Sequence, residues 1–323
     1  MSGTHVKGEA GGPLKPLSYT QNLEDYHLSL AFAGQEGGVY VDVGGGHPIG
    51  DNVSMWFYER GWSGIVVEPQ EALARLYPHV RPRDTVHAGL VGAAEGEATF
   101  HVFPKLHGLS TMNAANAQGS SVHGDAYRTV TLPVTTLAAL FDANGVGRID
   151  FLKIDVEGAE ADVIAGNDWS RYRPAVVVVE AIAPDTNAPA HEAWEPMLIE
   201  AGYRFRLDDT LNRFYVASER PDILERLPEA RGDWSAVTHM YEIGKAPDNP
   251  RHPDHELATA LTRAFWASLP TMDRRLLGEL LARSRGLGTD SPEASDLAEE
   301  IGGDALRAAL ARIACGYDGG QLG

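Results

Sequence analysis

The sequence predicts an α/β fold: a mostly parallel β-sheet that ends in an antiparallel hairpin, followed by a small C-terminal helical extension. Between residues 18 and 218, short apolar runs alternate with helical patterns, as strands and crossover helices do around a parallel sheet. The run at residues 176–180 is apolar enough to be a strand buried on both faces. Two strand-like runs surround a turn at 208–212, which predicts the hairpin.

The parallel part is expected to hold five strands with helices between them. The strands are expected at residues 39–43, 64–68, 85–89, 149–155 and 175–181, and the helices at 51–60, 70–77, 137–144 and 158–165. A further helix is expected at 190–201, before the hairpin. A parallel sheet that ends in this way is the layout of Rossmann-like class I methyltransferases, whereas dinucleotide dehydrogenases continue with a second parallel half.

The residue composition and the helical patterns of the chain divide it into four segments. Residues 1–17 are expected to form a flexible N-terminal tail, 18–220 the methyltransferase domain, 221–256 a Pro-rich loop region and 257–323 a helical C-terminal extension of three or four short helices. The role of the extension is open between dimerisation as a homodimer, a lid over the acceptor pocket, and simple packing.

Composition limits the classes of function. The chain has 27 Lys and Arg against 45 Asp and Glu, and this formal charge of -18 disfavours nucleic acid as a partner. Cys315 is the single cysteine, which excludes a disulfide framework and a Cys-based zinc cluster. The longest apolar run, residues 175–179, is too short to span a membrane, and no secretory signal is visible, so a cytoplasmic protein is expected.

The first chemical motif is the loop VDVGGGHP that follows the first expected strand. Asp42 precedes the loop, and Gly44 and Gly46 let a ligand approach the backbone closely. Matched as G-x-G-x-x-G, the third glycine falls one residue late at Gly50, and Pro48 interrupts the loop. A pyrophosphate is therefore disfavoured, whereas a nucleoside that carries an amino acid and no phosphates fits.

The second motif is the pair Glu68 and Pro69 at the end of the second expected strand. Glu68 follows Asp42 by 26 positions, and an acidic residue there accepts hydrogen bonds from both ribose hydroxyls of an adenosyl ligand. The glycine loop and Glu68 together predict an adenosyl cofactor. The broken phosphate pattern and the terminal hairpin favour S-adenosylmethionine over a nicotinamide dinucleotide.

The third motif is a set of acidic residues, Asp155, Glu157 and Glu180, that follow or end two neighbouring expected strands. Because carboxyl ends of parallel strands meet at one edge, we expect Asp155 and Glu180 to face the reacting end of the cofactor. The set can hold a divalent cation such as Mg²⁺, which would lower the pKa of an acceptor hydroxyl. In the other interpretation, Asp155 binds the methionine amino group or shapes the turn, and Glu180 only orients the substrate. Both interpretations stay open.

A histidine is the remaining catalytic candidate. Methyl transfer from a sulfonium is an in-line displacement, which needs alignment of the acceptor and removal of its proton. His47 lies on the glycine loop, so we expect it to act as base or to orient the substrate, unless it serves only local hydrogen bonding. His101, His107 and His123 lie in a less regular stretch and are poorer candidates. Met240 and Tyr241 are candidates for the acceptor pocket.

Five ordered blocks of the sequence resemble the FkbM family of S-adenosylmethionine-dependent methyltransferases. They are SYTQNLED (18–25), YVDVGGGHP (40–48), FYERGWSGIVVEP (57–69), GLSTM (108–112) and FLKIDVEGAE (151–160). The resemblance covers about residues 18–218. It implies a Rossmann-like methyltransferase fold and O-methylation of hydroxyls on sugars, glycolipids, polysaccharides or polyketide natural products.

The resemblance also implies site positions that the residues alone do not indicate. Gln21 belongs to the family's N-terminal block, together with Glu24 and Asp25, and this block is expected to lie over the cofactor. Ser110 and Thr111 match a block beside the site. The chain departs from the family in two places: Leu23 stands where a Gly is frequent, and Gly45 where the family often has Ala followed by a polar residue.

The sequence thus predicts an S-adenosylmethionine-dependent O-methyltransferase. Its expected acceptor is a small molecule or oligosaccharide, methylated on a hydroxyl of a sugar, glycoside or polysaccharide precursor, with the use of Mg²⁺ left open. The alternatives are an O-methyltransferase of a polyketide-type natural product, a nicotinamide-dependent oxidoreductase on the same type of sheet, and a non-catalytic partner protein.

Overall fold

The computed structural model of the chain contains two compact units. It describes residues 15–103, 110–112, 127–183, 188–285 and 304–318. The larger unit runs from Lys15 to Glu242, and the chain from Ile243 onward belongs to the second unit. The larger unit therefore extends beyond residue 220, the end expected from the sequence, and it begins before residue 18.

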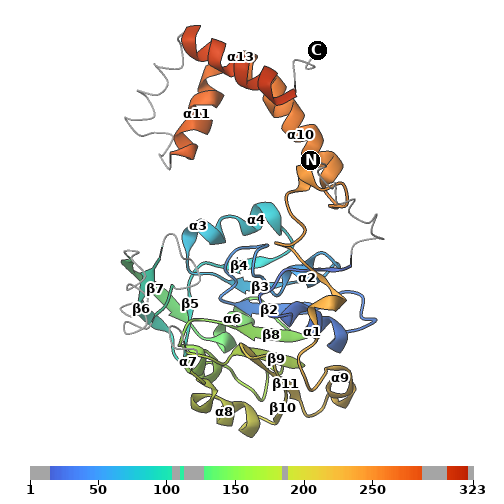
Figure 1. Cartoon of the computed structure of the whole chain (residues 1–323). Helices are drawn as coiled ribbons and strands as arrows, with labels where there is room; N and C mark the ends of the chain where they lie inside the picture. Colours follow the sequence, from blue (N-terminus) through green and yellow to red (C-terminus); the bar gives the residue numbers. More distant parts are fainter. Residues whose placement is uncertain (1–14, 104–109, 113–126, 184–187, 286–303, 319–323) are drawn as a thin grey trace. The chain divides into compact units, whose positions relative to one another are not determined.

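A seven-stranded sheet organises the larger unit. Its strand order is β10-β11-β9-β8-β2-β3-β4, which Figure 1 shows from β10 at the bottom to β4 at the top. The strands are β2 (Val39–Val43), β3 (Ser63–Val67), β4 (Thr85–His87), β8 (Phe151–Ile154), β9 (Val176–Glu180), β10 (Tyr203–Asp208) and β11 (Asn212–Ala217). The strands β4, β3, β2, β8 and β9 pair in parallel, and β11 and β10 pair antiparallel. The mostly parallel sheet with a terminal hairpin is confirmed.

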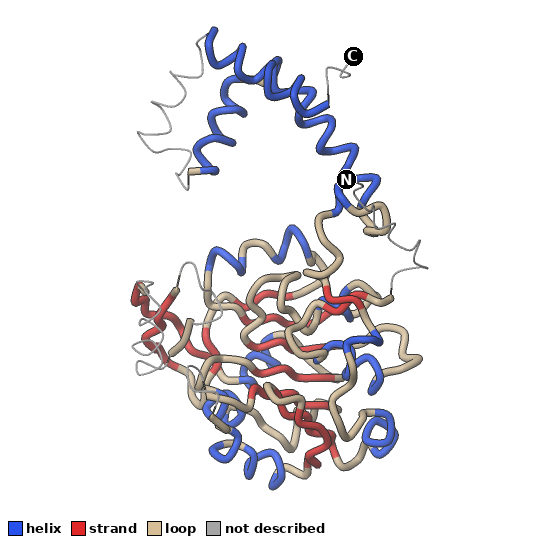
Figure 2. The backbone as a smooth tube through the Cα atoms, in the orientation of Figure 1, coloured by secondary structure: helices blue, strands red, loops and turns tan. Residues whose placement is uncertain are grey.

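Side chains on the two faces of this sheet form two separate cores. On one face, Tyr40, Val66 and Phe151 pack with α1 (Glu24–Ala31), α2 (Met55–Tyr58) and α9 (Pro221–Arg226). On the other face, Val41 and Ile154 pack with α6 (Leu137–Ala143), α7 (Glu160–Ala165) and α8 (Glu195–Glu200). Successive residues of a strand alternate between the two cores, so both faces are covered, as parallel sheets require. Figure 2 shows the resulting layers of helix and strand.

Several expected helices are shorter or divided. The helix expected at 51–60 is reduced to α2, because Asp51 has a left-handed φ of 54° and ends any helix there. The helix expected at 70–77 is divided into α3 (Glu71–Ala74) and α4 (Tyr77–Val80), with Pro78 in the first turn of α4. The helix expected at 190–201 opens with a 3₁₀ turn at His191–Ala193 before α8. Helix α1 was not expected.

The stretch between β4 and α6 is more regular than its sequence indicated. A three-stranded sheet of order β5-β7-β6 joins β5 (Leu90–Val91), β6 (Gly96–Val102) and β7 (Arg128–Thr135), and β6 and β7 pair antiparallel. Leu90, Phe100 and Val102 form its small core. His101 therefore lies on a strand, whereas His107 and His123 lie outside the described residues.

The segment after the hairpin returns to the larger unit. Ile223, Leu227 and Val237 are buried in the core that contains α1. A two-residue strand, β12 (Thr238–His239), then pairs in parallel with β1 (Leu17–Ser18) near the start of the described chain. This pairing brings residues 238–241 beside residues 17–21.

The second unit is helical. Its described helices are α10 (His255–Ser268), α11 (Arg274–Ser284) and α13 (Asp304–Asp318), with 3₁₀ turns at Ala246–Asp248 and Leu269–Thr271. Leu269, Met272, Leu277 and Leu310 form its core. Within the described residues of both units, no helix is long and apolar enough to cross a membrane.

Candidate functional site

A cavity of about 700 Å³ lies at the carboxyl ends of β2, β3, β8 and β9. The chain runs outward from β2 in one direction to β3 and β4, and β8 and β9 lie on its other side. In open α/β sheets, ligands bind where the strand order reverses in this way. The lining of the cavity includes these residues that the sequence singled out: Gln21, Glu24, Gly44, Gly46, His47, Glu68, Pro69, Ser110, Asp155, Glu157, Glu180, Met240 and Tyr241.

The glycine loop is packed tightly against the ends of the two neighbouring strands. The amides of Gly44 and Gly45 both donate to the carbonyl of Val67, at 3.0 Å. Gly44 has a φ of 82°, and a Cβ there would lie 1.7 Å from the carbonyl oxygen of Asp155. Only glycine fits this position. The loop therefore presents bare backbone to the cavity.

Glu68 holds the glycine loop to the end of β3. One carboxylate oxygen accepts from the amide of Gly46 at 2.8 Å, and the other accepts from the amide of Gln70 at 2.7 Å. The side chain is 2% exposed, and burial raises the pKa of Glu68 to about 7. A buried carboxylate on the cavity wall is thus oriented before any ligand arrives.

Asp42 lies beneath the loop and is not among the residues that line the cavity. Its carboxylate accepts from the hydroxyl of Ser54 at 2.5 Å. Asp42 is the penultimate residue of β2 and points to the face covered by α2, because side chains alternate along a strand. Asp42 therefore supports the loop from below in this structure, and its direct contact with the ligand stays a prediction.

Arg81 completes this support and was missed in the sequence. The guanidinium is fully buried and donates to Asn52 Oδ1 at 2.7 Å, to Ser54 Oγ at 2.8 Å and to the carboxylate of Asp84. Asn52 in turn donates from Nδ2 to the carbonyl of Gly45 at 2.8 Å. The only sequence signal was an arginine, followed by Arg83, in a turn bounded by Pro78 and Pro82, which is not specific.

The three carboxylates predicted at the strand ends do come together. Asp155, Glu157 and Glu180 each offer an oxygen within 4.8 Å of the others. Burial first, and then repulsion by Asp155 and Glu157, raises the pKa of Glu180 to about 11. Glu180 Oε2 is buried and has no hydrogen-bond partner among the described residues. A proton or a cation is needed to hold these groups so close.

Lys153 is a further lining residue that sequence analysis did not single out. Its Nζ donates to Asp155 Oδ2 at 2.6 Å, and its side chain is 6% exposed. Burial acts to lower the pKa of Lys153, but the charges of Asp155 and Asp42 outweigh it and raise the pKa. Its signal was a charged residue inside the otherwise apolar strand FLKI. Lys153 orients Asp155, and its charge also interacts with Asp42 beneath the glycine loop.

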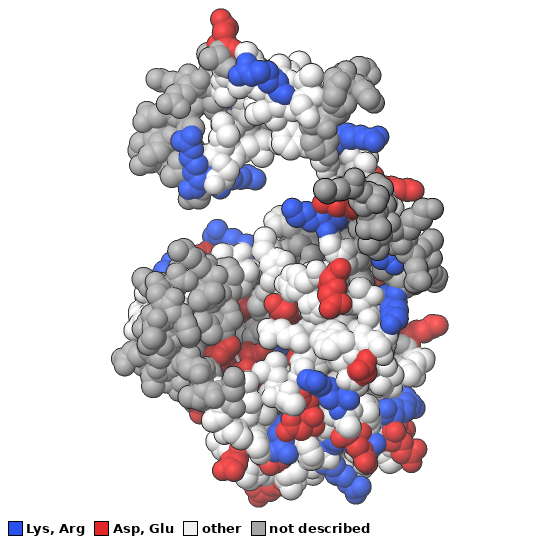
Figure 3. Space-filling model, in the orientation of Figure 1, with Lys and Arg blue, Asp and Glu red and all other residues white. Residues whose placement is uncertain are grey.

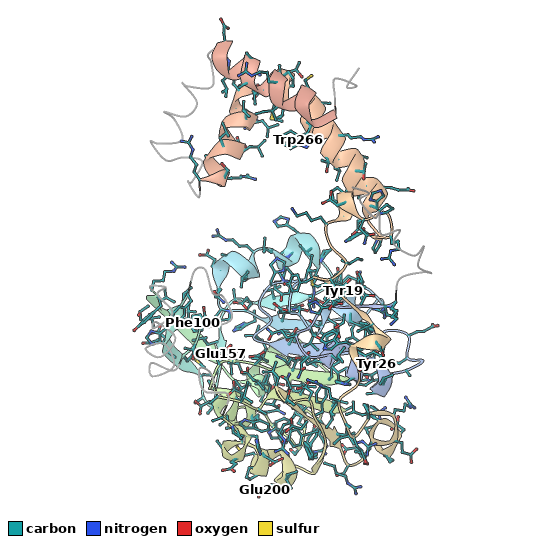
Figure 4. The ribbon with its side chains drawn as sticks, in the orientation of Figure 1. Tyr19, Tyr26, Phe100, Glu157, Glu200 and Trp266 are labelled. Atoms are coloured by element: carbon teal, nitrogen blue, oxygen red, sulfur yellow. The ribbon has the colours of Figure 1, made fainter. Side chains whose placement is uncertain are left out.

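Glu157 has a strained backbone. Its φ is 57°, a left-handed conformation that is unfavourable for a residue with a side chain. The hydroxyl of Thr111 donates to its carbonyl at 2.8 Å, and Glu160 accepts from the amide of Gly158 at 3.0 Å. Strain held in place by neighbouring bonds is common at functional sites. Figure 4 shows Glu157 and Phe100 on the same side of the larger unit, away from Tyr26.

His47 accepts hydrogen bonds from its own loop. Its Nδ1 accepts from the amides of Ile49 at 3.2 Å and Gly50 at 3.0 Å. A neutral imidazole that accepts at Nδ1 carries its proton on Nε2. That nitrogen is then a donor, which suits orientation of a substrate oxygen better than removal of a proton.

The remaining wall comes from the two ends of the larger unit. Met240 and Tyr241 line the cavity with Gln21 and Leu211. The carbonyl of Thr20 lies 3.0 Å from the Nε2 of His239 and reinforces the pairing of β1 with β12. Ser110 also lines the cavity, and its hydroxyl accepts from the amide of Phe103 at 3.0 Å.

A mostly parallel α/β sheet, with a cavity where the strand order reverses and a glycine loop and acidic strand ends around it, is an architecture of methyltransferases. The chain belongs to the FkbM methyltransferase family: the family model described as "Methyltransferase FkbM domain" matches residues 42–205, half of the chain. The resemblance drawn from the sequence blocks is confirmed. A search of curated proteins finds no match. Gln21, Leu211, Met240 and Tyr241 lie outside the matched residues.

Proposed function

We propose that the protein is an S-adenosylmethionine-dependent O-methyltransferase that methylates a hydroxyl of a sugar, glycoside or polysaccharide precursor. The observation that carries the proposal is the placement of the Glu68-bound glycine loop and the carboxylate cluster in one cavity. The strand order supports a Rossmann-like class I fold, because the sheet reverses at β2 and ends in a hairpin. The volume of about 700 Å³ is within the range of small-molecule sites.

Each part of the cofactor has residues that fit it. Glu68 offers acceptor oxygens for the ribose hydroxyls, and Pro69 lies beside it. The glycine loop gives the methionine part room against the backbone at Gly46, where an added Cβ would meet no protein atom within 4 Å, whereas Gly44 lets the loop pack against the carbonyl of Asp155. In the interpretation without a cation, Asp155, held by Lys153, is oriented to accept from the methionine amino group. Apolar contact for the adenine is available from Val91 and Phe100.

The chemistry requires few protein groups. When bound, S-adenosylmethionine supplies an electrophilic methyl group. His47 Nε2–H orients the acceptor oxygen, and a carboxylate of the cluster receives the hydroxyl proton. Glu180 holds a proton at neutral pH, which lowers repulsion inside the cluster. The low-dielectric wall strengthens each of these interactions.

We also propose that the cluster binds a divalent cation. Three carboxylate oxygens within 4.8 Å and the unsatisfied Oε2 of Glu180 are oxygen ligands of the kind that Mg²⁺ prefers. With a cation bound, Asp155, Glu157 and Glu180 would hold it beside the acceptor oxygens and lower the pKa of the reacting hydroxyl.

Calorimetric titration with S-adenosylmethionine and S-adenosylhomocysteine tests the cofactor. We expect Glu68→Gln to weaken binding by about 10- to 100-fold, because a hydrogen bond to a charged acceptor is lost. Glu71→Gln is the matched control, since Glu71 is exposed on α3 and does not line the cavity. Absence of binding to the wild-type protein, or binding of NADH instead, overturns the proposal.

Thermal unfolding with and without Mg²⁺ tests the cation independently of turnover. We expect Mg²⁺ to raise the Tm of the wild-type protein, because an ion that binds only the folded state stabilises it. Glu180→Gln should abolish this shift, whereas Glu225→Gln, on the exposed surface of α9, should keep it. Equal shifts in both variants contradict the assignment of the ligands.

A further inference from the structure

We infer that Tyr241 is a positioning residue: its hydroxyl, bonded to Asp51, holds the loop that carries His47 in the arrangement that the reaction needs. The inference rests on the proposed function, because it takes His47 as the group that orients the acceptor oxygen. Tyr241 lies outside the residues that the family model matches, so this role comes from the contacts of this chain alone.

The loop from His47 to Asp51 has exposed ends. His47 and Asp51 are both exposed, whereas Pro48 between them is buried and its carbonyl accepts from Arg81 at 3.3 Å. Asp51 has a left-handed φ of 54°, which is unfavourable for a residue with a Cβ. A contact from outside the loop is therefore required to hold its end at Asp51 in this conformation.

Tyr241 provides that contact. Its hydroxyl is hydrogen-bonded to Asp51. Partial burial, and then the charge of Asp51, raises the pKa of Tyr241, so the hydroxyl stays protonated and donates. An added Cβ at Gly50 would lie 2.7 Å from the Tyr241 hydroxyl oxygen and 3.8 Å from His47 Nδ1. The Tyr241 hydroxyl and the His47 imidazole therefore both lie against Gly50, whose amide donates to His47 Nδ1 at 3.0 Å.

Tyr241 is itself held in place from the other side. Its amide donates to His239 Nδ1 at 3.2 Å, and the two rings lie 5.2 Å apart. A neutral imidazole that accepts at Nδ1 carries its proton on Nε2, and the Nε2 of His239 lies 3.0 Å from the carbonyl of Thr20. The amide of Met240 donates to the carbonyl of Ser18 at 3.0 Å. Tyr241 thus connects the paired strands β1 and β12 to the loop of His47.

This connection matters for the reaction because alignment limits an in-line displacement. Met240 and Tyr241 line the same cavity as His47. With Nδ1 occupied by the loop amides, the Nε2–H of His47 donates in a fixed direction. Loss of the Tyr241 hydroxyl would leave this donor chemically intact but would loosen its orientation.

Chemical modification of His47 tests the arrangement without substrate or cofactor. Diethyl pyrocarbonate acylates the unprotonated imidazole nitrogen, which is Nδ1 here, and the loop amides that donate to Nδ1 shield it. We expect Tyr241→Phe to raise the rate of His47 modification by at least about threefold, because one hydrogen bond is lost. Exposed His79, on α4, is followed by mass spectrometry in the same sample and should keep its wild-type rate.

Two variants at Asp51 separate the hydrogen bond from surface charge. Figure 3 shows acidic and basic side chains on the surface of the larger unit, so removal of a carboxylate also changes the charge around it. Asp51→Asn keeps an acceptor oxygen and tolerates a left-handed φ, so the rate at His47 should stay within about twofold of wild type. Asp51→Gly removes the acceptor, and Tyr241→Phe should then cause no further increase.

Cofactor binding distinguishes positioning of His47 from a general loosening of the glycine loop. Gly46 is held by Glu68 and not by Tyr241, so the Kd of S-adenosylhomocysteine, measured by calorimetry, should stay close to the wild-type value in Tyr241→Phe. Tyr26→Phe is the matched control, because Tyr26 lies on α1 and does not line the cavity. It should leave both the modification rate and the Kd unchanged.

The outcomes distinguish the two levels of the argument. Equal rates of His47 modification in the wild type and in Tyr241→Phe overturn the inference, and so does an increase that persists in full in the Asp51→Gly background. Faster modification together with a loss of affinity for S-adenosylhomocysteine also overturns it, because Tyr241 would then support the whole glycine loop. Failure of the wild-type protein to bind S-adenosylmethionine overturns the proposed function and leaves the placement of His47 by Tyr241 standing.

Discussion

The two sides of the cavity are built in opposite ways. Beneath the glycine loop, the buried polar side chains of Asp42, Asn52, Ser54 and Arg81 are joined in one hydrogen-bonded network. At the carboxylate cluster, like charges lie close together, and Glu180 Oε2 has no described partner. The first arrangement stabilises the fold, whereas the second lowers its stability.

This difference separates the scaffold from the reacting groups. A ligand-binding loop gains precision from a rigid support, so satisfied hydrogen bonds belong beneath it. Groups that must accept a proton or a cation have to remain unsatisfied until the ligand arrives, and they reduce stability in the free protein. Substitutions on the two sides should therefore change stability in opposite directions.

The largest effect is expected at Arg81. Arg81→Met should lower the free energy of unfolding by about 3–5 kcal/mol, because Asp84 would be left as an uncompensated buried charge. Urea denaturation measures the change. Arg75→Met, which removes an exposed i,i+4 ion pair with Glu71, is the control and should cost less than about 1 kcal/mol. Equal losses in both variants would mean that the buried network is not the support described.

A smaller effect of opposite sign is expected at Glu180. The pKa of Glu180 is raised from 4.5 to about 11 in the folded protein, so the folded state retains a proton that the unfolded chain releases. Wild-type stability should therefore fall as the pH rises between these values. Glu180→Gln should stabilise the metal-free protein at pH 9 and change its stability little at pH 5, because the neutral amide replaces a carboxyl group that must stay protonated in the folded state.

Urea denaturation at the two pH values checks this prediction. Glu225→Gln on exposed α9 is the control and should show no such pH-dependent gain. A Glu180→Gln protein that is less stable than wild type at pH 9 would show that the carboxylate is satisfied in the free protein.

The smallest effect is expected at Glu157. Glu157→Gly should stabilise the protein by about 1 kcal/mol, because glycine adopts a φ of 57° without the strain of a Cβ. Glu157→Ala removes the same carboxylate but retains the Cβ, so the difference between the two variants measures the backbone strain. Thermal unfolding of both is sufficient, and an Ala variant as stable as the Gly variant would exclude strain at this residue.

The sequence predicted the sheet and one side of the site better than the connections. Apolar runs such as the one in β9 define central strands because both of their faces are buried, and the ends of those strands then locate Glu68, Asp155 and Glu180. The sequence placed Asp42 on the correct strand. It did not show which face of the sheet the Asp42 side chain points to, because alternation along a strand does not tell which face packs against α2.

Long-range contacts were beyond the reach of sequence patterns. Arg81 lies 29 positions from Asn52, and nothing local indicates that their side chains meet. The strands β1 and β12 pair although they lie more than 200 positions apart, and each strand has only two residues. Lys153 was visible as a charge in an apolar strand, but the strand pattern did not show that it would pair with Asp155.

The parallel pairing of β1 with β12 has a consequence for how the enzyme can be divided. A fragment that ended at residue 205, where the family match ends, would lack β11, Leu211 and the whole of the segment that carries Tyr241. Proteolysis between residues 220 and 238 would leave β11 and Leu211 in place but would separate Met240 and Tyr241 from the sheet, so the cavity would lose that part of its wall. The shortest fragment expected to keep the complete cavity runs from Lys15 to Glu242. The wall of the cavity is therefore completed by residues near both ends of this fragment.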